Sequence, residues 1–342
     1  MTRRQGSKAE AFSPSLLVTP NTMTPTVSII TGFLGSGKTT LLRALLQRGP
    51  DGMGGKRVAL IVNEIGDIAF DGRQVEGLGY SEMIELTGGC ICCALGSEFL
   101  LAVEELIEFA APDLILIETT GLAEPVSMVR QIRAADLPLD SVITVADAAN
   151  LAGALELATV AQWQLRAADF VLLSKVDLVS AAQLDAASAL VRRHNRRAAI
   201  FPTSSGNLDW RLVFGLNAPG GQLELQPPEG HLEADGFVAR VWRGDRPLDR
   251  VRFERALGAM PAALYRLKGH VYCGDAPWPT LVNMVCGRVE FTTTRFRTPP
   301  ASLNELVLIG PLGAGADALL ARLDEGMLDA PDAAAWRRKH EL

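Results

Sequence analysis

Residues 32–39 read GFLGSGKT and stand between a short apolar run and a leucine-rich stretch. The run before them, TVSII, has the β-branched residues of a strand, and TLLRALLQ after them has the spacing of a helix. Gly35 and Gly37 let the backbone curl until several N–H groups converge on one anion, and a helix start adds its positive end. The segment therefore predicts a phosphate-binding loop between a strand and a helix.

The loop fits the pattern G-x-x-x-x-G-K-[ST], in which each residue type has a chemical task. We expect Lys38 to neutralise the β- and γ-phosphates of a nucleotide and the Thr39 hydroxyl to ligate Mg²⁺. A glycine-rich turn with a stray lysine is the alternative, and the strand and helix on either side favour the nucleotide. The candidate nucleotide-binding residues here are Gly32, Gly35, Ser36, Gly37, Lys38, Thr39 and Thr40.

Apolar runs alternate with helical patterns from residue 26 to about residue 214. The buried-strand runs RVALIVNEIGD, DLILIETTG, SVITVAD and DFVLLSKVD are separated by helical stretches such as residues 100–110 and 181–193. This repetition predicts an α/β fold whose mainly parallel sheet is covered on both faces. With the loop, it indicates a P-loop NTPase domain over residues 26–214.

A second domain is expected after residues 215–235, whose paired glycines and paired prolines read as a linker. Beyond it, GFVARVW, LYRLKGHVYC, TLVNMVCGRVEFTT and NELVLIG are strand-like, while RVRFERALGAM and ADALLARLDEGML have helical spacing. We expect a smaller α+β domain over residues 236–327. Residues 1–25 are predicted to be a disordered leader, and residues 328–342 a frayed tail.

The strand run FVLLSKVDLV ends in Ser174, Lys175 and Asp177, the [NTS]-K-x-D pattern of GTP-binding proteins. An aspartate there accepts hydrogen bonds from the ring N–H and the exocyclic amine of guanine, and adenine offers no such pair. The lysine stem can lie over the base. Ser174 replaces the usual asparagine, and a solvated turn is the alternative. Ser204, in PTSSGNLD, is a weaker candidate for a second base contact.

Carboxylates follow two of the strand runs: Glu64 and Asp67 in VNEIGD, and Glu118 in LIETTG. Mg²⁺ keeps much of its water shell, so carboxylates at buried strand ends suit it. Glu118 is the preferred magnesium-side acid, and Gly121 is expected to let the backbone close on a γ-phosphate as a switch. Any one carboxylate could instead cap a helix. The candidate catalytic residues are Lys38, Thr39, Glu118 and Asp67.

The segment TGGCICCALGSE places Cys90, Cys92 and Cys93 within four positions just before a helical pattern. A disulfide within C-x-C would be strained, and a helix start favours the thiolates that bind metals. We therefore expect a metal site, with buried thiols as the alternative. Glu64 is the most economical further ligand, and such a set suits Zn²⁺, with Co²⁺ possible in the same geometry. Cys273 and Cys286 lie in apolar patterns and are expected in the core.

The chain as a whole excludes some functions. Its formal charge of −6 over 342 residues argues against a nucleic-acid partner, because phosphate binding needs a basic face. No apolar run approaches the ~20 residues that span a membrane, and the leader is too short in apolar residues for a signal peptide. We expect a cytoplasmic protein, where clustered cysteines more often bind metal than form disulfides.

TGFLGSGKTT, NEIGD, GGCICC, ETTGLAEP and SKVD occur in that order, and YRLKGHVY follows in the second domain. Together they resemble the CobW family of P-loop GTPases, proposed metallochaperones, over nearly the whole chain except its two ends. The resemblance implies a metal-binding C-x-C-C motif, GTP hydrolysis, delivery of Zn²⁺ or Co²⁺, and a smaller domain packed on the GTPase. Many members carry a histidine-rich run between the domains, whereas this linker has only His231.

The sequence thus predicts a GTP-hydrolysing metallochaperone that serves a client metalloprotein of unknown identity, as a monomer or homodimer. Glu64 would join the two halves, since it lies on a loop between the phosphate site and the cysteines. An ATP-using P-loop enzyme with structural cysteines is one alternative. A GTP-binding regulatory or interaction module without metal delivery is the other.

Overall fold

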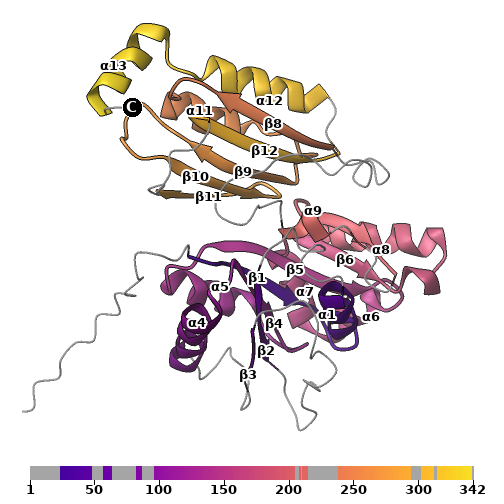
Figure 1. The fold of residues 1–342 in the computed structure, drawn as a ribbon. Helices are drawn as coiled ribbons and strands as arrows, with labels where there is room; N and C mark the ends of the chain where they lie inside the picture. Colours follow the sequence, from indigo (N-terminus) through magenta and orange to yellow (C-terminus); the bar gives the residue numbers. More distant parts are fainter. Residues whose placement is uncertain are drawn as a thin grey trace, which may run out of the picture.

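The computed structural model describes residues 24–47, 57–63, 82–86, 96–204, 208, 210–214, 238–293, 302–311 and 314–340. These residues form one sheet of seven strands and a second sheet of five. Figure 1 shows the second sheet stacked above the first. The expected leader up to residue 23 and the expected linker lie outside the described residues.

The first sheet is wholly parallel, in the order β3-β2-β4-β1-β5-β6-β7. All residues of β4 and β6 are buried, as expected for strands covered on both faces. The chain leaves β1 toward β2, β3 and β4 and later passes it to reach β5, β6 and β7. The carboxyl end of β1 is therefore a switch point, where sheets of this kind bind ligands. The strands are β1 (Thr26–Thr31), β2 (Val58–Asn63), β3 (Glu82–Leu86), β4 (Leu114–Glu118), β5 (Leu139–Asp147), β6 (Phe170–Ser174) and β7 (Ala199–Pro202).

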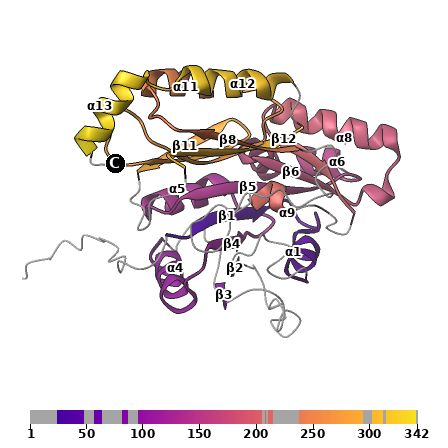
Figure 2. The ribbon, with the colours of Figure 1, turned by 45° about the horizontal axis from the view of Figure 1, so that its top comes forward.

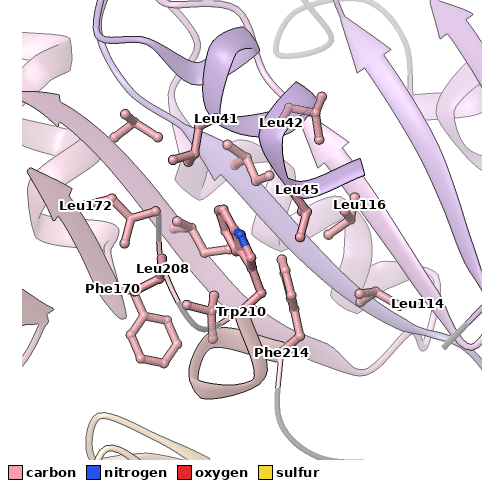
Figure 3. Close-up of a cluster of buried hydrophobic side chains, with 14 of the residues drawn as sticks. Leu41, Leu42, Leu45, Leu114, Leu116, Phe170, Leu172, Leu208, Trp210 and Phe214 are labelled. Atoms are coloured by element: carbon pink, nitrogen blue, oxygen red, sulfur yellow. The ribbon is translucent and has the colours of Figure 1, made fainter. Parts of the chain in front are cut away.

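Helices lie on both sides of this sheet (Figures 1 and 2). On one face α1 (Lys38–Gln47) and α9 (Trp210–Phe214) share an apolar cluster with alternate strand residues. Figure 3 shows its centre, where the rings of Trp210 and Phe214 stack at 5.7 Å. The opposite face carries α4 (Gly96–Ala110), α5 (Pro125–Ala134), α6 (Leu151–Leu157), α7 (Thr159–Ala167) and α8 (Ala181–His194). The predicted α/β domain with a parallel sheet is confirmed.

The second sheet is antiparallel, in the order β11-β10-β9-β12-β8. Two helices, α11 (Arg250–Gly258) and α12 (Ala314–Glu325), cover the side that faces away from the first sheet (Figures 1 and 2). The smaller α+β domain that the sequence predicts is confirmed. Its strands are β8 (Val238–Gly244), β9 (Arg266–Val271), β10 (Thr280–Val285), β11 (Arg288–Thr293) and β12 (Asn304–Gly310).

The strand-like run TLVNMVCGRVEFTT is a hairpin rather than one strand. β10 and β11 pair from Val285 and Arg288 outward, so that Cys286 and Gly287 alone form the turn. Both turn residues have positive φ, 47° at Cys286 and 83° at Gly287. Two successive left-handed residues make the turn that matches the twist of a two-residue hairpin. This turn was not predicted from the sequence, because cysteine is not among the residues that usually mark a turn.

The frayed tail predicted from residue 328 is wrong for residues 330–340, which form helix α13 (Ala330–His340). The Asp329 carboxylate accepts a hydrogen bond from the backbone N–H of Asp332 at the helix start. Trp336 is buried, and its ring meets that of Tyr272 edge-on at 5.6 Å. One aromatic anchor thus docks a helix whose other residues show little apolar pattern.

The open face of the second sheet packs on the first domain. Val307 and Ile309 of β12 belong to the same buried cluster as α1 and α9. Beside this apolar contact, the fully buried carboxylate of Asp140, at the start of β5, pairs with Arg266 and Lys268 of β9. These two cations come from the YRLKGHVY motif, so the motif supplies polar side chains to the contact between the domains.

Candidate functional site

The predicted phosphate loop joins the end of β1 to the start of α1. Gly35 and Gly37 have φ of 69° and 97°, in the left-handed region that favours glycine. At Gly32 a Cβ atom would lie 2.1 Å from the backbone oxygen of Val145, so no larger residue fits there. The sequence pattern therefore reflects real backbone requirements at these three positions.

Lys38 lies over the loop and donates hydrogen bonds to the carbonyl oxygens of Gly32, at 2.8 Å, and Phe33, at 3.4 Å. Ser36 is buried, whereas Thr40, the last of the seven candidate residues, is exposed. Among the residues that the structure describes, the Ser36 hydroxyl meets no hydrogen-bond partner. A buried hydroxyl normally has one, so this oxygen suits a bound anion.

The Thr39 hydroxyl donates a hydrogen bond to the Glu118 carboxylate at 3.1 Å, over 79 residues of sequence. Glu118 ends β4 and is 5% exposed, and its strand lies directly beside β1. A hydroxyl and a carboxylate in contact at the phosphate loop are the oxygen ligands that suit a Mg²⁺ ion and its water shell. Asp67, the other candidate acid, lies outside the described residues.

The loop after β4 lies against the phosphate loop. A Cβ atom on Gly121 would stand 2.6 Å from the Leu34 side chain and 2.8 Å from its backbone nitrogen. The loop is also fastened to β1, because the Thr119 N–H donates to the carbonyl oxygen of Ile30 at 2.9 Å. The Thr120 hydroxyl is buried and has no partner within the described ranges. Gly121 therefore lies beside the phosphate loop, and its role as a switch stays a prediction.

The base-side motif reaches the same loop from β6. The Ser174 hydroxyl donates to the carbonyl oxygen of Ser36 at 2.6 Å, and the Lys175 ammonium donates to that of Gly35 at 2.9 Å. Lys175 adopts a left-handed φ of 58°, which turns the chain into the short helix η2 (Val176–Leu178) with Asp177 exposed on it. This geometry brings both parts of the predicted nucleotide site together.

Asp147, which was not among the residues predicted from the sequence, ends β5 and pairs with Lys175 at 2.8 Å. Burial alone would raise the pKa of Asp147, but hydrogen bonds from Lys175, Asn150 and the Ala149 backbone outweigh burial and lower it. The carboxylate thus stays charged and holds the lysine stem in place. Asp147 could have been predicted from its position at the end of a buried strand, which is the pattern that identified Glu118.

Ser204 follows β7, whose last residue pairs with Leu173 of β6. The Thr203 N–H donates to the carbonyl oxygen of Leu173 at 2.8 Å, so this turn continues the edge at which Ser174 ends. Ser204 therefore lies at the same edge of the sheet as the rest of the base-side motif. A contact with the base stays a prediction.

The predicted metal ligands Glu64, Cys90, Cys92 and Cys93 lie outside the described residues, as does His231. Within the described part of the chain, no group of three or more His, Cys, Asp or Glu side chains is placed to hold a metal ion. Cys273 and Cys286 are buried free thiols, as predicted. Burial raises the pKa of the Cys273 thiol to about 11 and that of Cys286 to about 12, so both stay protonated at neutral pH.

Residues 26–202 match a family model described as the CobW/HypB/UreG nucleotide-binding domain. Residues 237–327 match a model of the C-terminal domain of the cobalamin synthesis protein CobW. The chain belongs to the CobW family. The resemblance that the motifs predicted is confirmed, and both parts of this CobW-family chain take part in it.

Three relatives show how far the similarity extends. The zinc chaperone CobW of Sinorhizobium sp is 33% identical over 309 residues, which cover 77% of this chain and 86% of that protein. The zinc chaperone YjiA of Escherichia coli is 33% identical over 272 residues, 73% of this chain and 83% of that one. The zinc-regulated GTPase metalloprotein activator 1 of Schizosaccharomyces pombe is 34% identical over 195 residues, 54% of this chain and 46% of that one.

Across the described ranges of this CobW-family chain, no helix has the length and apolar character needed to cross a bilayer.

Proposed function

We propose that this protein is a GTP-hydrolysing zinc chaperone that holds its cargo at the C-x-C-C motif and delivers it to a client protein. The proposal rests on one observation, that two sets of contacts converge on the phosphate loop. The Thr39 hydroxyl donates a hydrogen bond to Glu118, while Ser174 and Lys175 donate to carbonyl oxygens of the loop from the base side. The similarity to proteins named zinc chaperones, over most of their length, supports zinc as the cargo.

Hydrolysis would use the phosphate loop as an electrostatic cradle. Lys38 would exchange its two carbonyl partners for β- and γ-phosphate oxygens, while Thr39 and Glu118 would hold Mg²⁺. When bound, Mg²⁺ neutralises charge that develops on the phosphates. Water would attack the γ-phosphorus as its bond to the bridging oxygen breaks, giving GDP and phosphate. The Gly121 loop, which lies close to Leu34 of the phosphate loop, would sense whether the γ-phosphate is present.

Guanine selectivity would come from the exposed carboxylate of Asp177, which can accept two hydrogen bonds from the base. The lysine stem of Lys175, held by Asp147 and by Gly35, would lie along the base. Ser204 is the candidate for a further contact with the base. A preference for ATP over GTP in a binding competition would contradict this assignment.

The cargo site would consist of Cys90, Cys92 and Cys93, with Glu64 as a further ligand. Glu64 directly follows the last residue of β2 in the sequence, and we expect it to act between the phosphate site and the cysteines. Loss of the γ-phosphate would then loosen one metal ligand. Thermodynamic linkage requires that zinc change nucleotide affinity by the same factor by which the nucleotide changes zinc affinity.

A competitive zinc titration in a non-hydrolysable GTP analogue and in GDP tests this function. Couplings between sites are commonly about 1–3 kcal/mol, so we expect zinc affinities that differ by roughly 5- to 150-fold. Replacing Cys90, Cys92 and Cys93 together with Ser should abolish tight binding, while Cys273→Ala, which removes a buried thiol, should not. Equal affinities in both nucleotides would contradict nucleotide-controlled delivery.

A further inference from the structure

Gln164, in α7, is a buried polar residue that neither the sequence motifs nor the proposed chemistry uses. Its side chain is 1% exposed. The carboxamide nitrogen donates to the carbonyl oxygens of Gly121, at 3.1 Å, and Ala123, at 3.2 Å. Both partners can only accept, so the amide nitrogen, with its two hydrogens, must face them. Gln164 therefore holds the loop after β4 at two points.

The same loop also lies close to the phosphate loop. Gly121 has no room for a Cβ atom because Leu34 is so close. The loop begins at Glu118, which accepts the hydrogen bond from Thr39. Gly121 thus lies close to Leu34 at its Cα, and its carbonyl oxygen accepts a hydrogen bond from the Gln164 amide. A shift of this loop toward or away from the phosphates requires one of these two contacts to change.

Helix α7 is itself well anchored, so that Gln164 acts from a fixed base. The Thr144 hydroxyl of β5 donates to the backbone carbonyl oxygen of Gln164 at 2.8 Å. At the end of the helix, the Asn195 amide donates to the carbonyl oxygens of Leu165 and Ala168, both at 2.8 Å. The chain then enters β6, which ends in the base-side motif. Gln164 therefore connects the loop after β4 to helix α7, which is followed along the chain by β6 and the base-side motif.

We propose that Gln164 is a positioning residue that sets the conformation of the Gly121–Ala123 loop and thereby the preference for GTP over GDP. This inference rests on the proposed GTPase function. A trans peptide fixes its N–H opposite to its C=O, so holding the Gly121 oxygen also fixes the direction of the next N–H. A loop whose peptides are already oriented loses less entropy when it meets a γ-phosphate. GDP has no γ-phosphate, so the affinity for GDP does not depend on the hydrogen bonds that Gln164 donates to this loop.

The test replaces Gln164 with Met, which keeps the length of the side chain and removes both donors. We expect the ratio of affinities for a non-hydrolysable GTP analogue and GDP to fall roughly tenfold. Two hydrogen bonds of ordinary strength set an upper bound of about 150-fold. The value of kcat/KM for GTP should fall with that ratio, while GDP affinity stays within about twofold of the native value.

Gln162→Met is the matched control, because Gln162 lies in the same helix and its amide donates to the Leu155 carbonyl oxygen, far in sequence from the loop. It should leave the affinity ratio unchanged. Gln164→Asn keeps the amide but is one methylene shorter, so it should give a smaller loss and serves if the Met variant folds poorly. Thermal unfolding of all three variants separates stability from positioning.

The positioning role of Gln164 and the proposed GTPase function are contradicted by different results. An unchanged affinity ratio in a folded Gln164→Met or Gln164→Asn protein would overturn the positioning role, as would loss of folding in both variants. The native protein decides the proposed function separately: if it neither prefers GTP nor hydrolyses it, that function fails whatever Gln164 does. If the native protein does both and the variants match it, the inference on Gln164 fails alone.

Discussion

At the scale of single residues, Ser174 shows how a departure from a motif can preserve its structural task. The pattern usually has asparagine there, and from the sequence the serine weakens the assignment to GTP. In the structure its one hydroxyl donates to the Ser36 carbonyl oxygen, 138 residues away. A single donor is enough to hold the phosphate loop. This partner was not predictable, because it depends on β1 and β6 ending at the same edge of one sheet.

Ser174→Ala should lower the affinities for GTP and GDP together, by roughly fivefold, since one hydrogen bond of about 1 kcal/mol is lost from the loop that both nucleotides share. Isothermal titration with each nucleotide measures this. Ser180→Ala is the control, because the Ser180 hydroxyl accepts from Gln183 at the start of α8 and caps that helix. It should cost stability and leave both affinities unchanged. Native-like affinities in Ser174→Ala would show that the loop needs no brace from β6.

At the scale of elements, the predicted strands and helices of the first domain were found where buried apolar runs or clear helical spacing marked them. β3 was missed because EMIEL is a run of only five residues, two of them acidic, and among the described strands it lies at the sheet edge beside β2. The hairpin turn at Cys286 and α13 were missed for another reason. Each depends on a tertiary contact or a backbone angle that no local pattern reveals.

Two glycine substitutions should change stability in opposite directions. Gly287→Ala should destabilise the protein by about 1–2 kcal/mol, because φ is 83° there although nothing crowds the site. Gly153→Ala, in α6 and equally uncrowded, should stabilise it by up to about 1 kcal/mol by restricting the unfolded chain. Chemical denaturation of both variants measures the difference. A Gly287→Ala protein as stable as the native protein would mean that the hairpin turn is not left-handed in solution.

At the scale of the whole molecule, two domains were predictable from the paired glycines and prolines of residues 215–235, but the contact between the domains was not. The motif YRLKGHVY stood out only as a family feature. Its Arg266 is 1% exposed and pairs with Asp140, which is fully buried and 126 residues earlier in the chain. Arg288 repeats the arrangement with Asp169 at 2.7 Å. Charges from β9 and β11 thus meet carboxylates at the starts of β5 and β6, at the opposite ends of those strands from the nucleotide site.

Asp140→Ala should therefore destabilise the protein by about 3–5 kcal/mol, because it leaves the buried guanidinium of Arg266 without its carboxylate. Asp317→Ala is the control: it also removes an aspartate paired with an arginine, Arg240, but its carboxylate is 64% exposed. That change should cost less than about 1 kcal/mol. Urea unfolding of both variants gives the comparison. If Asp140→Ala lost no more stability than the control, Arg266 would have to find water or another partner on substitution. The apolar contact of β12 with α1 and α9 would then hold the domains together without the ion pair.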